Sequence, residues 1–148
     1  MRVVFRSSSL IFTLLGIVFN APVSRVREVL RRGQAGRVRI GMAVADVLSL
    51  FGKRGRPAAD GERIDVFLLS SLQGRPDLSI ATQDGTVSMI RVYSRRYRTE
   101  DGIGVADPVA ELAKAYPIRW LAESVAEVES LHMRFHIGNK RIASIELS

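Results

Sequence analysis

Internal self-similarity is the feature that most constrains this chain, because a repeated unit must be packed against its own copy. A short apolar stretch that opens with Ile-Gly and ends near an aromatic residue occurs at 40–52 and again at 103–117. Further along, residues 87–92 (VSMIRV) match residues 142–147 (IASIEL) at a spacing of 55 residues. The sequence therefore predicts two copies of one small unit, at 38–98 and 99–148.

Each copy is predicted to begin with a short helix. The first helix contains residues 45–47 (ADV) and the second contains 110–112 (AEL), with the second copy two residues longer at its start. Asp107 and Pro108 are a good start for the second helix. The Asp side chain accepts hydrogen bonds from free backbone amides, and proline suits the first helical position.

Apolar alternation after each helix predicts antiparallel strands. The expected strands are 64–68, 78–82 and 87–92 in the first copy, and about 118–124, 133–137 and 142–147 in the second. Turn residues at Asp84-Gly85 and Gly138-Asn139 join the last two strands of each copy into a β-hairpin. We therefore expect an α+β fold made of tandem helix-plus-three-stranded units, with the sheet covered by helices on one face.

Residues 1–21 have a basic start followed by an apolar run at 10–19, which is typical of a secretory signal peptide or an N-terminal membrane anchor. The run is shorter than the ~20 residues that span a bilayer comfortably as a helix. The alternative is a buried N-terminal element of a cytosolic protein. The first interpretation predicts a protein that is periplasmic, or anchored in the inner membrane and facing the periplasm.

Residues 22–37 form a basic lead-in to the first repeat. The helical spacing of Val23, Val26, Val29 and Leu30 predicts a short amphipathic helix that ends near Gly33. Such a helix could contact anionic lipid or nucleic-acid phosphates. The other interpretation is a solvated, arginine-rich linker between the membrane and the repeats.

Several kinds of chemistry are excluded or unsupported. The chain has no cysteine, so disulfides, cysteine-bound zinc and a lipid-anchored outer-membrane form are excluded. His132 and His136 stand four apart on a predicted strand, and ~13 Å is too far for them to share one zinc ion. No nucleophile motif or matched pair of acids occurs. We expect no enzyme, no cofactor and no metal.

The net charge of +7 favours an acidic partner. The arginines are spread along the chain instead of forming one block. We interpret residues 52–57 as a turn that ends the first helix, and residues 95–98 as a linker between the repeats instead of a nucleic-acid surface. We expect Trp120, the single tryptophan, to lie in the core.

The first helix, with its pattern Gly-Met-Ala-x-x-Asp-Val-x-x-x-Phe-Gly at 41–52, together with the three strands, resembles the BamE family, also called SmpA/OmlA. These are small outer-membrane lipoproteins that assist the assembly of barrel proteins. A tandem of such units also looks like the β-lactamase inhibitor proteins. The resemblance covers roughly residues 38–148 and implies a fold more than a task.

Together these features predict an exported envelope protein that binds a protein partner through the uncovered face of its sheet. A basic cytosolic nucleic-acid-binding protein and a secreted enzyme inhibitor are the alternatives. No nucleic acid is expected as a partner, and the N-terminus could add membrane association. The predicted partner-binding residues point outward on the strands or follow them: Met89, Arg91, Tyr93, Arg95, His132, Arg134 and His136.

Overall fold

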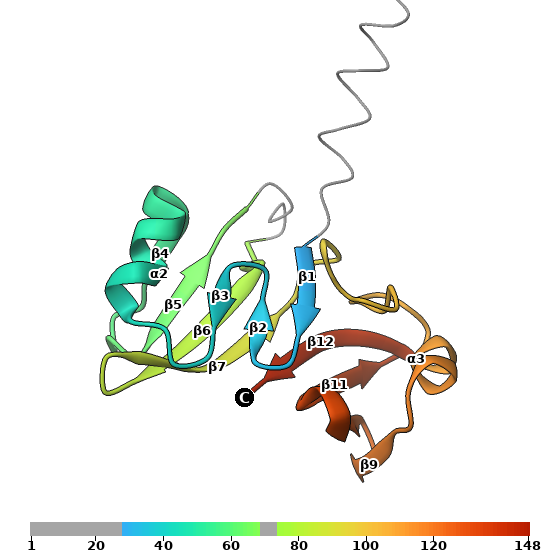
Figure 1. The fold of residues 1–148 in the computed structure, drawn as a ribbon. Helices are drawn as coiled ribbons and strands as arrows, with labels where there is room; N and C mark the ends of the chain where they lie inside the picture. The colour runs from blue at the N-terminus through green and yellow to red at the C-terminus, as the bar shows by residue number, and fades with distance from the viewer. Residues whose placement is uncertain (1–27, 69–73) are drawn as a thin grey trace, which may run out of the picture.

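The alternating apolar stretches form one large antiparallel sheet that runs through the molecule (Figure 1). The computed structural model describes residues 28–68 and 74–148. Within them the chain is α+β, as predicted, with two α-helices and two sheets. The strands of the eight-stranded sheet are, in order across it, β4 (Gly55–Pro57), β5 (Arg63–Val66), β6 (Leu78–Gln83), β7 (Thr86–Val92), β12 (Arg141–Leu147), β11 (Met133–Gly138), β10 (Val125–Val128) and β9 (Arg119–Ala122).

The large sheet has two halves, which meet where β7 pairs with β12. Each half contributes four strands, whereas three were predicted. In the second half, the single strand expected near 118–124 is the β9–β10 hairpin, since the chain turns at Glu123 and Ser124. In the first half, the additional strand is β4, which pairs with β5. It lies in the segment that was interpreted only as a helix-ending turn.

The two central hairpins, β6–β7 and β11–β12, share one geometry. Their turns place both residues at positive φ, at Asp84 (52°) and Gly85 (78°) in the first and at Asn139 (52°) and Lys140 (62°) in the second. This backbone pair is typical of type I′ turns, whose twist matches that of antiparallel strands. Each hairpin also has one irregularity in register, after residue 81 in the first and after residue 136 in the second.

One short helix in each half adds a side chain to the core. Helix α2 (Val44–Phe51) buries Val47, and helix α3 (Val109–Ala115) buries Leu112. Two 3₁₀ turns accompany them, η1 (Gly52–Arg54) after α2 and η2 (Glu129–Leu131) after β10. The two predicted helices are therefore present, at the expected places in the chain.

The start of α3 differs from the prediction. Pro108 is the extended residue before the first helical turn, and the helix has no side-chain cap. The Asp107 carboxylate instead accepts a hydrogen bond from the Gly104 amide at 3.0 Å and pairs with Nη1 of Arg98 at 2.9 Å. A nearby guanidinium therefore engages the carboxylate that was expected to cap the helix.

The described part of the basic lead-in belongs to a second sheet, so both the predicted helix and the solvated linker are wrong for residues 28–37. Leu30 is buried at 1% exposure. Gly36 turns the chain at φ 58°, where a Cβ atom would lie 2.9 Å from Oε2 of Glu28. The strands of this four-stranded sheet are, in order, β3 (Val38–Arg39), β2 (Gln34–Ala35), β1 (Glu28–Arg31) and β8 (Tyr97–Thr99).

Pairing with a distant strand explains this outcome. Strand β1 runs parallel to β8, and two of the three residues of β8, Tyr97 and Arg98, belong to the segment 95–98 that the sequence predicted to be an inter-repeat linker. Backbone partners from so far along the chain are invisible to helical spacing, and tertiary context overrides such a weak local pattern. Residues 1–27, with the predicted signal, lie outside the described residues.

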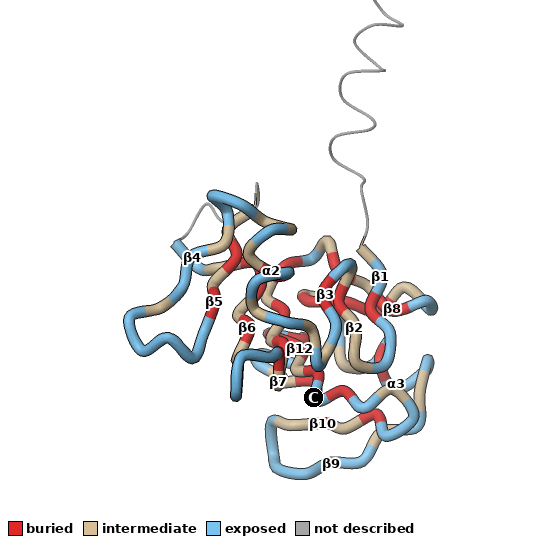
Figure 2. The backbone as a smooth tube through the Cα atoms, turned by 60° about the vertical axis from the view of Figure 1, so that its left-hand side comes forward, coloured by how far each residue is buried: buried red, intermediate tan, exposed pale blue. Residues whose placement is uncertain are grey.

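Alternating burial divides the large sheet into a core face and an open face. On β6, for example, Leu78 and Ile80 are fully buried, whereas Ser79 between them is only half-buried. Both helices and strands β1 to β3 contribute to the same core cluster, and Figure 2 shows the buried segments gathered inside the molecule. The largest fully buried side chains include Phe135, Leu30, Leu78, Ile80, Ile90, Leu112, Met133, Ile142, Ile145 and Leu147.

Trp120 does not lie in the core, contrary to the prediction. It is 49% exposed, and Leu121 beside it is 42% exposed. Both residues belong to β9, the outermost strand of the sheet, in which every residue is exposed. An aromatic residue in an apolar run was a reasonable candidate for the core, but its strand lies at an edge, which only the sheet order reveals.

We expect Trp120→Ala to lower the free energy of unfolding by less than about 1 kcal/mol, because half of the side chain is already in water. Phe135→Ala, the matched deletion of a fully buried aromatic ring, should cost about 3–5 kcal/mol. Urea denaturation compares the two variants. Fluorescence emission from Trp120 should also resemble that of tryptophan in water, and a strongly blue-shifted emission would contradict its exposed position.

Candidate functional site

One row of side chains crosses the open face of the large sheet through all eight strands. Each member is paired in register with the next one across a strand boundary, so the row is continuous. Opposite charges at directly paired positions stabilise antiparallel strands, and like charges destabilise them. From β4 to β9 the row contains Arg56, Asp65, Ser79, Arg91, Glu146, Arg134, Glu127 and Arg119. Its charges alternate in sign on either side of the uncharged Ser79.

In the second half of the sheet the row is a chain of ion pairs. Arg119 donates from Nη2 to Oε1 of Glu127 at 2.5 Å. Arg134 lies between two carboxylates, with its Nε 3.6 Å from Oε2 of Glu127 and its Nη1 3.9 Å from Oε1 of Glu146. The hydrogen bond from Arg119, aided by Arg134, holds the pKa of Glu127 below its usual value. These charges therefore satisfy one another at neutral pH.

The centre of the row is its most buried part. Arg91 donates from Nη2 to Oε2 of Glu146 at 2.6 Å, and Nε2 of His136 lies 3.3 Å from the same oxygen. The Glu146 side chain is only 12% exposed. Burial raises the pKa of Glu146, but the hydrogen bonds from Arg91 and His136 and the Arg91 charge outweigh it, so the pKa of Glu146 lies below its usual value.

The structure places most of the predicted partner-binding residues on the open face. Arg91 and Arg134 belong to the row, and His136 lies beside it through its contact with Glu146. Met89 and Tyr93 stand two positions before and after Arg91, and both are partly exposed. Period-two alternation along β7 and β11 was sufficient to find these five side chains.

Two predicted site residues lie outside the strands of the large sheet. Arg95 is exposed in the connection between β7 and β8. His132 is exposed just after η2, in a left-handed conformation at φ 52°, and precedes the first residue of β11. The alternation had been extended one residue too far toward the N-terminus, because a 3₁₀ turn interrupts the chain before β11.

Sequence reasoning missed the three acids of the row and three of its other members, among them Arg119. Asp65 and Glu146 were within reach, since both alternate with buried residues on strands that were predicted. Glu127 and Arg119 were not, because β9 and β10 were not recognised as separate strands. The opposed charges at 91 and 146, which are 55 residues apart, are the signal that could have revealed the pair.

A hollow of about 430 Å³ opens on this face where the row reaches Ser79. Nε of Arg63 lies 3.2 Å from Oδ1 of Asp65, and the guanidinium carbon of Arg75 lies 5.4 Å from the centre of the Tyr93 ring. The hollow is lined by Arg63, Asp65, Arg75, Pro76, Ser79, Tyr93, Ala143 and Ser144.

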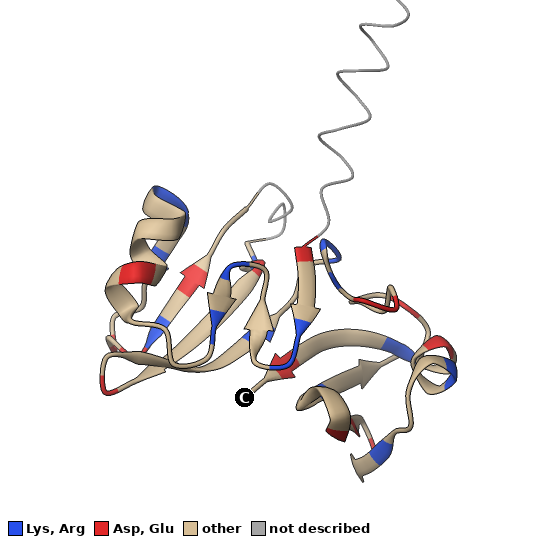
Figure 3. Ribbon diagram, viewed as in Figure 1, with Lys and Arg blue, Asp and Glu red and all other residues tan. Residues whose placement is uncertain are grey.

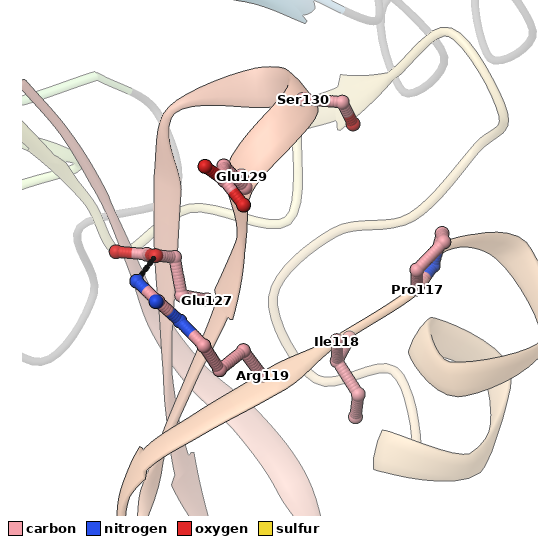
Figure 4. Close-up of a pocket in the computed structure, with 6 residues that line it drawn as sticks. All are labelled: Pro117, Ile118, Arg119, Glu127, Glu129 and Ser130. Carbon is pink, nitrogen blue, oxygen red and sulfur yellow. Dashed lines mark hydrogen bonds and ion pairs between the residues drawn. The ribbon is translucent and has the colours of Figure 1, made fainter.

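A smaller hollow of about 230 Å³ lies at the other end of the sheet, beside β9 and η2. Figure 4 shows the Arg119 side chain turned toward Glu127 there, with Pro117 and Ile118 on the other side. Its lining is formed by Pro117, Ile118, Arg119, Glu127, Glu129 and Ser130. Its arginine is engaged by a carboxylate, so this hollow offers less unpaired positive charge than the one at Ser79.

Charged positions are spread over the whole described body, at both ends of the large sheet (Figure 3). The described residues contain no group of three or more His, Asp and Glu side chains placed to bind one metal ion. None of the helices within 28–68 and 74–148 has the length and apolar character to cross a membrane.

A comparison with solved structures finds a likeness to the uncharacterized protein yfeY from Escherichia coli. The TM-score is 0.51 and the sequences are 13% identical, over 82% of this chain and 98% of that chain. No protein-family model matches the chain, and no curated protein matches it in sequence. At such low identity the likeness concerns the fold alone.

We expect stability to fall as the pH drops below 4.5, the ordinary glutamate value, and Glu146→Gln to weaken this dependence. The folded-state pKa of Glu146 is lowered, so its contribution is present above the ordinary pKa and is lost as the pH falls through the folded-state pKa. Urea denaturation at neutral pH and at about pH 3 tests this.

The matched control is Glu100→Gln. Glu100 forms an ion pair with Arg31 in which the two side chains are 68% and 62% exposed, and such a surface pair contributes little to stability. Its variant should retain the pH dependence of the natural chain. An equal weakening by both variants would contradict a special role of Glu146.

Proposed function

We propose that this chain is an exported bacterial envelope protein of the SmpA/OmlA-like type, which binds a protein partner through the open face of its large sheet and performs no catalysis. The observation that carries this proposal is the row from Arg56 to Arg119, presented by a sheet whose other face forms the core. A rigid sheet holds these charges in fixed positions, and fixed charge patterns give specificity for a complementary protein surface.

The charge pattern favours a protein partner over a nucleic acid. Arg91, Arg119 and Arg134 are paired with carboxylates of the same row. Nucleic-acid affinity comes mainly from free cations that neutralise phosphates, whereas Glu127 and Glu146 would lie against a phosphate backbone and repel it. The basic net charge therefore does not translate into a phosphate-binding surface on this face.

The proposal includes a tandem arrangement, with one helix and four antiparallel strands in each unit. Equivalent backbone hydrogen bonds tie the helices to the hairpins in both halves. The Val44 amide donates to the Gly85 carbonyl at 3.0 Å, and the Val109 amide donates to the Lys140 carbonyl at 2.9 Å. Equivalent residues of the two units are 65 apart in residue number near the helices and 55 apart in the hairpins. This constant spacing within each element supports units at 38–98 and 99–148.

The equivalent hydrogen bonds also change which residue of the second unit corresponds to Gly41. The Gly41 amide donates to the Val87 carbonyl at 2.7 Å, and the Ala106 amide donates to the Ile142 carbonyl at 2.8 Å. Gly41 has a φ of 86° and Ala106 a φ of 76°. The structural counterpart of Gly41 is therefore Ala106, a residue that rarely adopts this conformation, and not Gly104 as the sequence match suggested.

The junction of the halves also supports a tandem arrangement. Arg91 and Glu146 are counterparts in the two hairpins, and they pair with each other where β7 meets β12. Val92 pairs with Ile145, the counterpart of Ile90. When two copies of one strand pair about a two-fold axis, each position meets its own counterpart at the centre, which is the arrangement around Arg91 and Glu146.

We place residues 1–21 as a signal peptide or N-terminal anchor, and the folded body in the periplasm or at the periplasmic side of the inner membrane. The basic start and the apolar run at 10–19 support this placement. Strand β1 begins at Glu28, so an anchor retained at the N-terminus would hold the folded body near the membrane. The partner would then be another envelope protein.

A photo-reactive residue in place of Met89 or Arg134 should form a covalent adduct with a protein partner when the full chain is expressed in its own bacterium. The same residue in place of Ala113, exposed on α3, is the matched control and should form none, because α3 contributes to the core on the other side of the sheet. Mass spectrometry of the adducts identifies the partner. Adducts from position 113 alone would overturn the proposed surface.

Cell fractionation tests the location separately. The tagged chain should be recovered in the periplasmic or inner-membrane fraction, because the N-terminal segment has the layout of an export signal. Mass analysis of the recovered protein shows whether the first residues are still attached. Recovery in the cytosolic fraction alone would overturn the proposal of export and favour the basic cytosolic alternative.

A further inference from the structure

One of the positions at which the two halves of the open face differ lies on β6 in the first half and on β11 in the second. Arg134 in β11 fills its place in the row between Glu127 and Glu146. Its counterpart in β6 is Ser79, which stands in the same register between Asp65 and Arg91. The short serine side chain leaves the hollow of about 430 Å³. The first half therefore has an opening where the second half has a complete ladder of ion pairs.

Two guanidinium groups line this opening from different segments of the chain. Arg63, at the start of β5, uses Nε for Asp65 at 3.2 Å, and its side chain is 50% exposed. Arg75, in the segment before β6, lies over the face of the Tyr93 ring at 5.4 Å. A cation over an aromatic ring is held in place while its N–H groups stay available to an acceptor.

Two serine hydroxyls also line the hollow. Ser144 is only 6% exposed, and Ser79 is half-buried. Neither hydroxyl takes part in a hydrogen bond with the residues that the structure describes. A hydroxyl donates readily to a carboxylate oxygen. The lining thus combines two cations, two serine hydroxyls, the phenol of Tyr93 and a single acid, Asp65, that Arg63 already engages.

We propose that this hollow receives a carboxylate side chain from an acidic segment of the protein partner, bound by the guanidinium groups of Arg63 and Arg75 and by the hydroxyls of Ser79 and Ser144. This inference rests on the proposed function and names the chemistry of its partner. Arginine suits the task because its planar donors match the two oxygens of a carboxylate.

The surroundings favour a carboxylate on a polypeptide over a small free anion. The hollow lies within the row, so a segment that fills it also runs beside the exposed ion pairs of the neighbouring strands. Phosphate carries more charge and would be held close to Asp65, which repels it. A single negative charge within a polar polypeptide fits both the lining and its mixed surroundings.

The test measures binding of a fluorescent hexaglutamate peptide to the full chain, with hexalysine as the probe of opposite charge. Hexaglutamate should bind and hexalysine should not. Arg75→Gln should weaken hexaglutamate binding about tenfold, since it removes one of the two cations of the hollow. Arg39→Gln, the same change of charge at an exposed position on β3, should leave the affinity unchanged.

A second variant tests the hollow itself at constant charge. Ser79→Leu fills the opening and should also weaken hexaglutamate binding about tenfold, whereas Ser49→Leu, at an exposed position on α2, should not. Circular dichroism checks that each variant is folded. Equal losses in Arg75→Gln and Arg39→Gln, full binding by Ser79→Leu, no binding by the natural chain, or tighter binding of hexalysine would each overturn the proposal.

The outcome separates this inference from the proposed function. Adducts from positions 89 and 134, combined with a failed hexaglutamate test, would leave the open face as the partner surface and remove only the carboxylate site. Binding of hexaglutamate that depends on Ser79 and Arg75, without any adduct from the open face in cells, would support the site and count against an envelope protein as its partner.

Discussion

The pairing of β7 with β12 is the constraint on which the rest of the structure depends, because it joins two separate halves into one sheet. Ile90 and Leu147 meet on the core face of this junction and are fully buried, while Arg91 and Glu146 meet on the open face. If β7 and β12 did not pair, each half would expose one of these strands as an unpaired edge, which invites pairing with other chains. Their pairing therefore covers the edges of β7 and β12 and aligns the two halves of the open face in one continuous row.

The two halves of the large sheet have similar backbones but different side chains, which gives them different binding surfaces. Ser79 opens a hollow where Arg134 closes a ladder of ion pairs. The two edge strands also differ. Pro57 on β4 and Trp120 on β9 are at equivalent positions, because each is paired with a core residue of the neighbouring strand, Ile64 and Ala126. Proline blunts an edge because it has no amide to donate, whereas β9 leaves its tryptophan exposed. The backbone demands none of these differences, so they are candidates for function.

Local signals predicted the elements that are held together locally. Turn residues at Asp84-Gly85 marked the first hairpin, since they favour positive φ, and period-two alternation assigned Arg91, Arg134 and His136 to the open face. Distant pairing defeated the same reasoning elsewhere. Residues 28–31 of the lead-in form strand β1 because β8, far along the chain, supplies backbone partners. The β9–β10 hairpin was missed because its turn, Glu123-Ser124, carries no strong turn residue.

The sequence by itself determined the fold class, the two helices, the central hairpins and the alternation that separates core residues from open-face residues, because each depends on contacts between near neighbours. Tertiary structure alone decided the order of the strands, and with it the row of alternating charges, the hollow at Ser79 and the exposure of Trp120. Strand order is set by pairing between residues far apart in the sequence, such as Arg91 and Glu146, and no local pattern encodes which strands become neighbours. The candidate binding surface forms only when the strands have adopted this order.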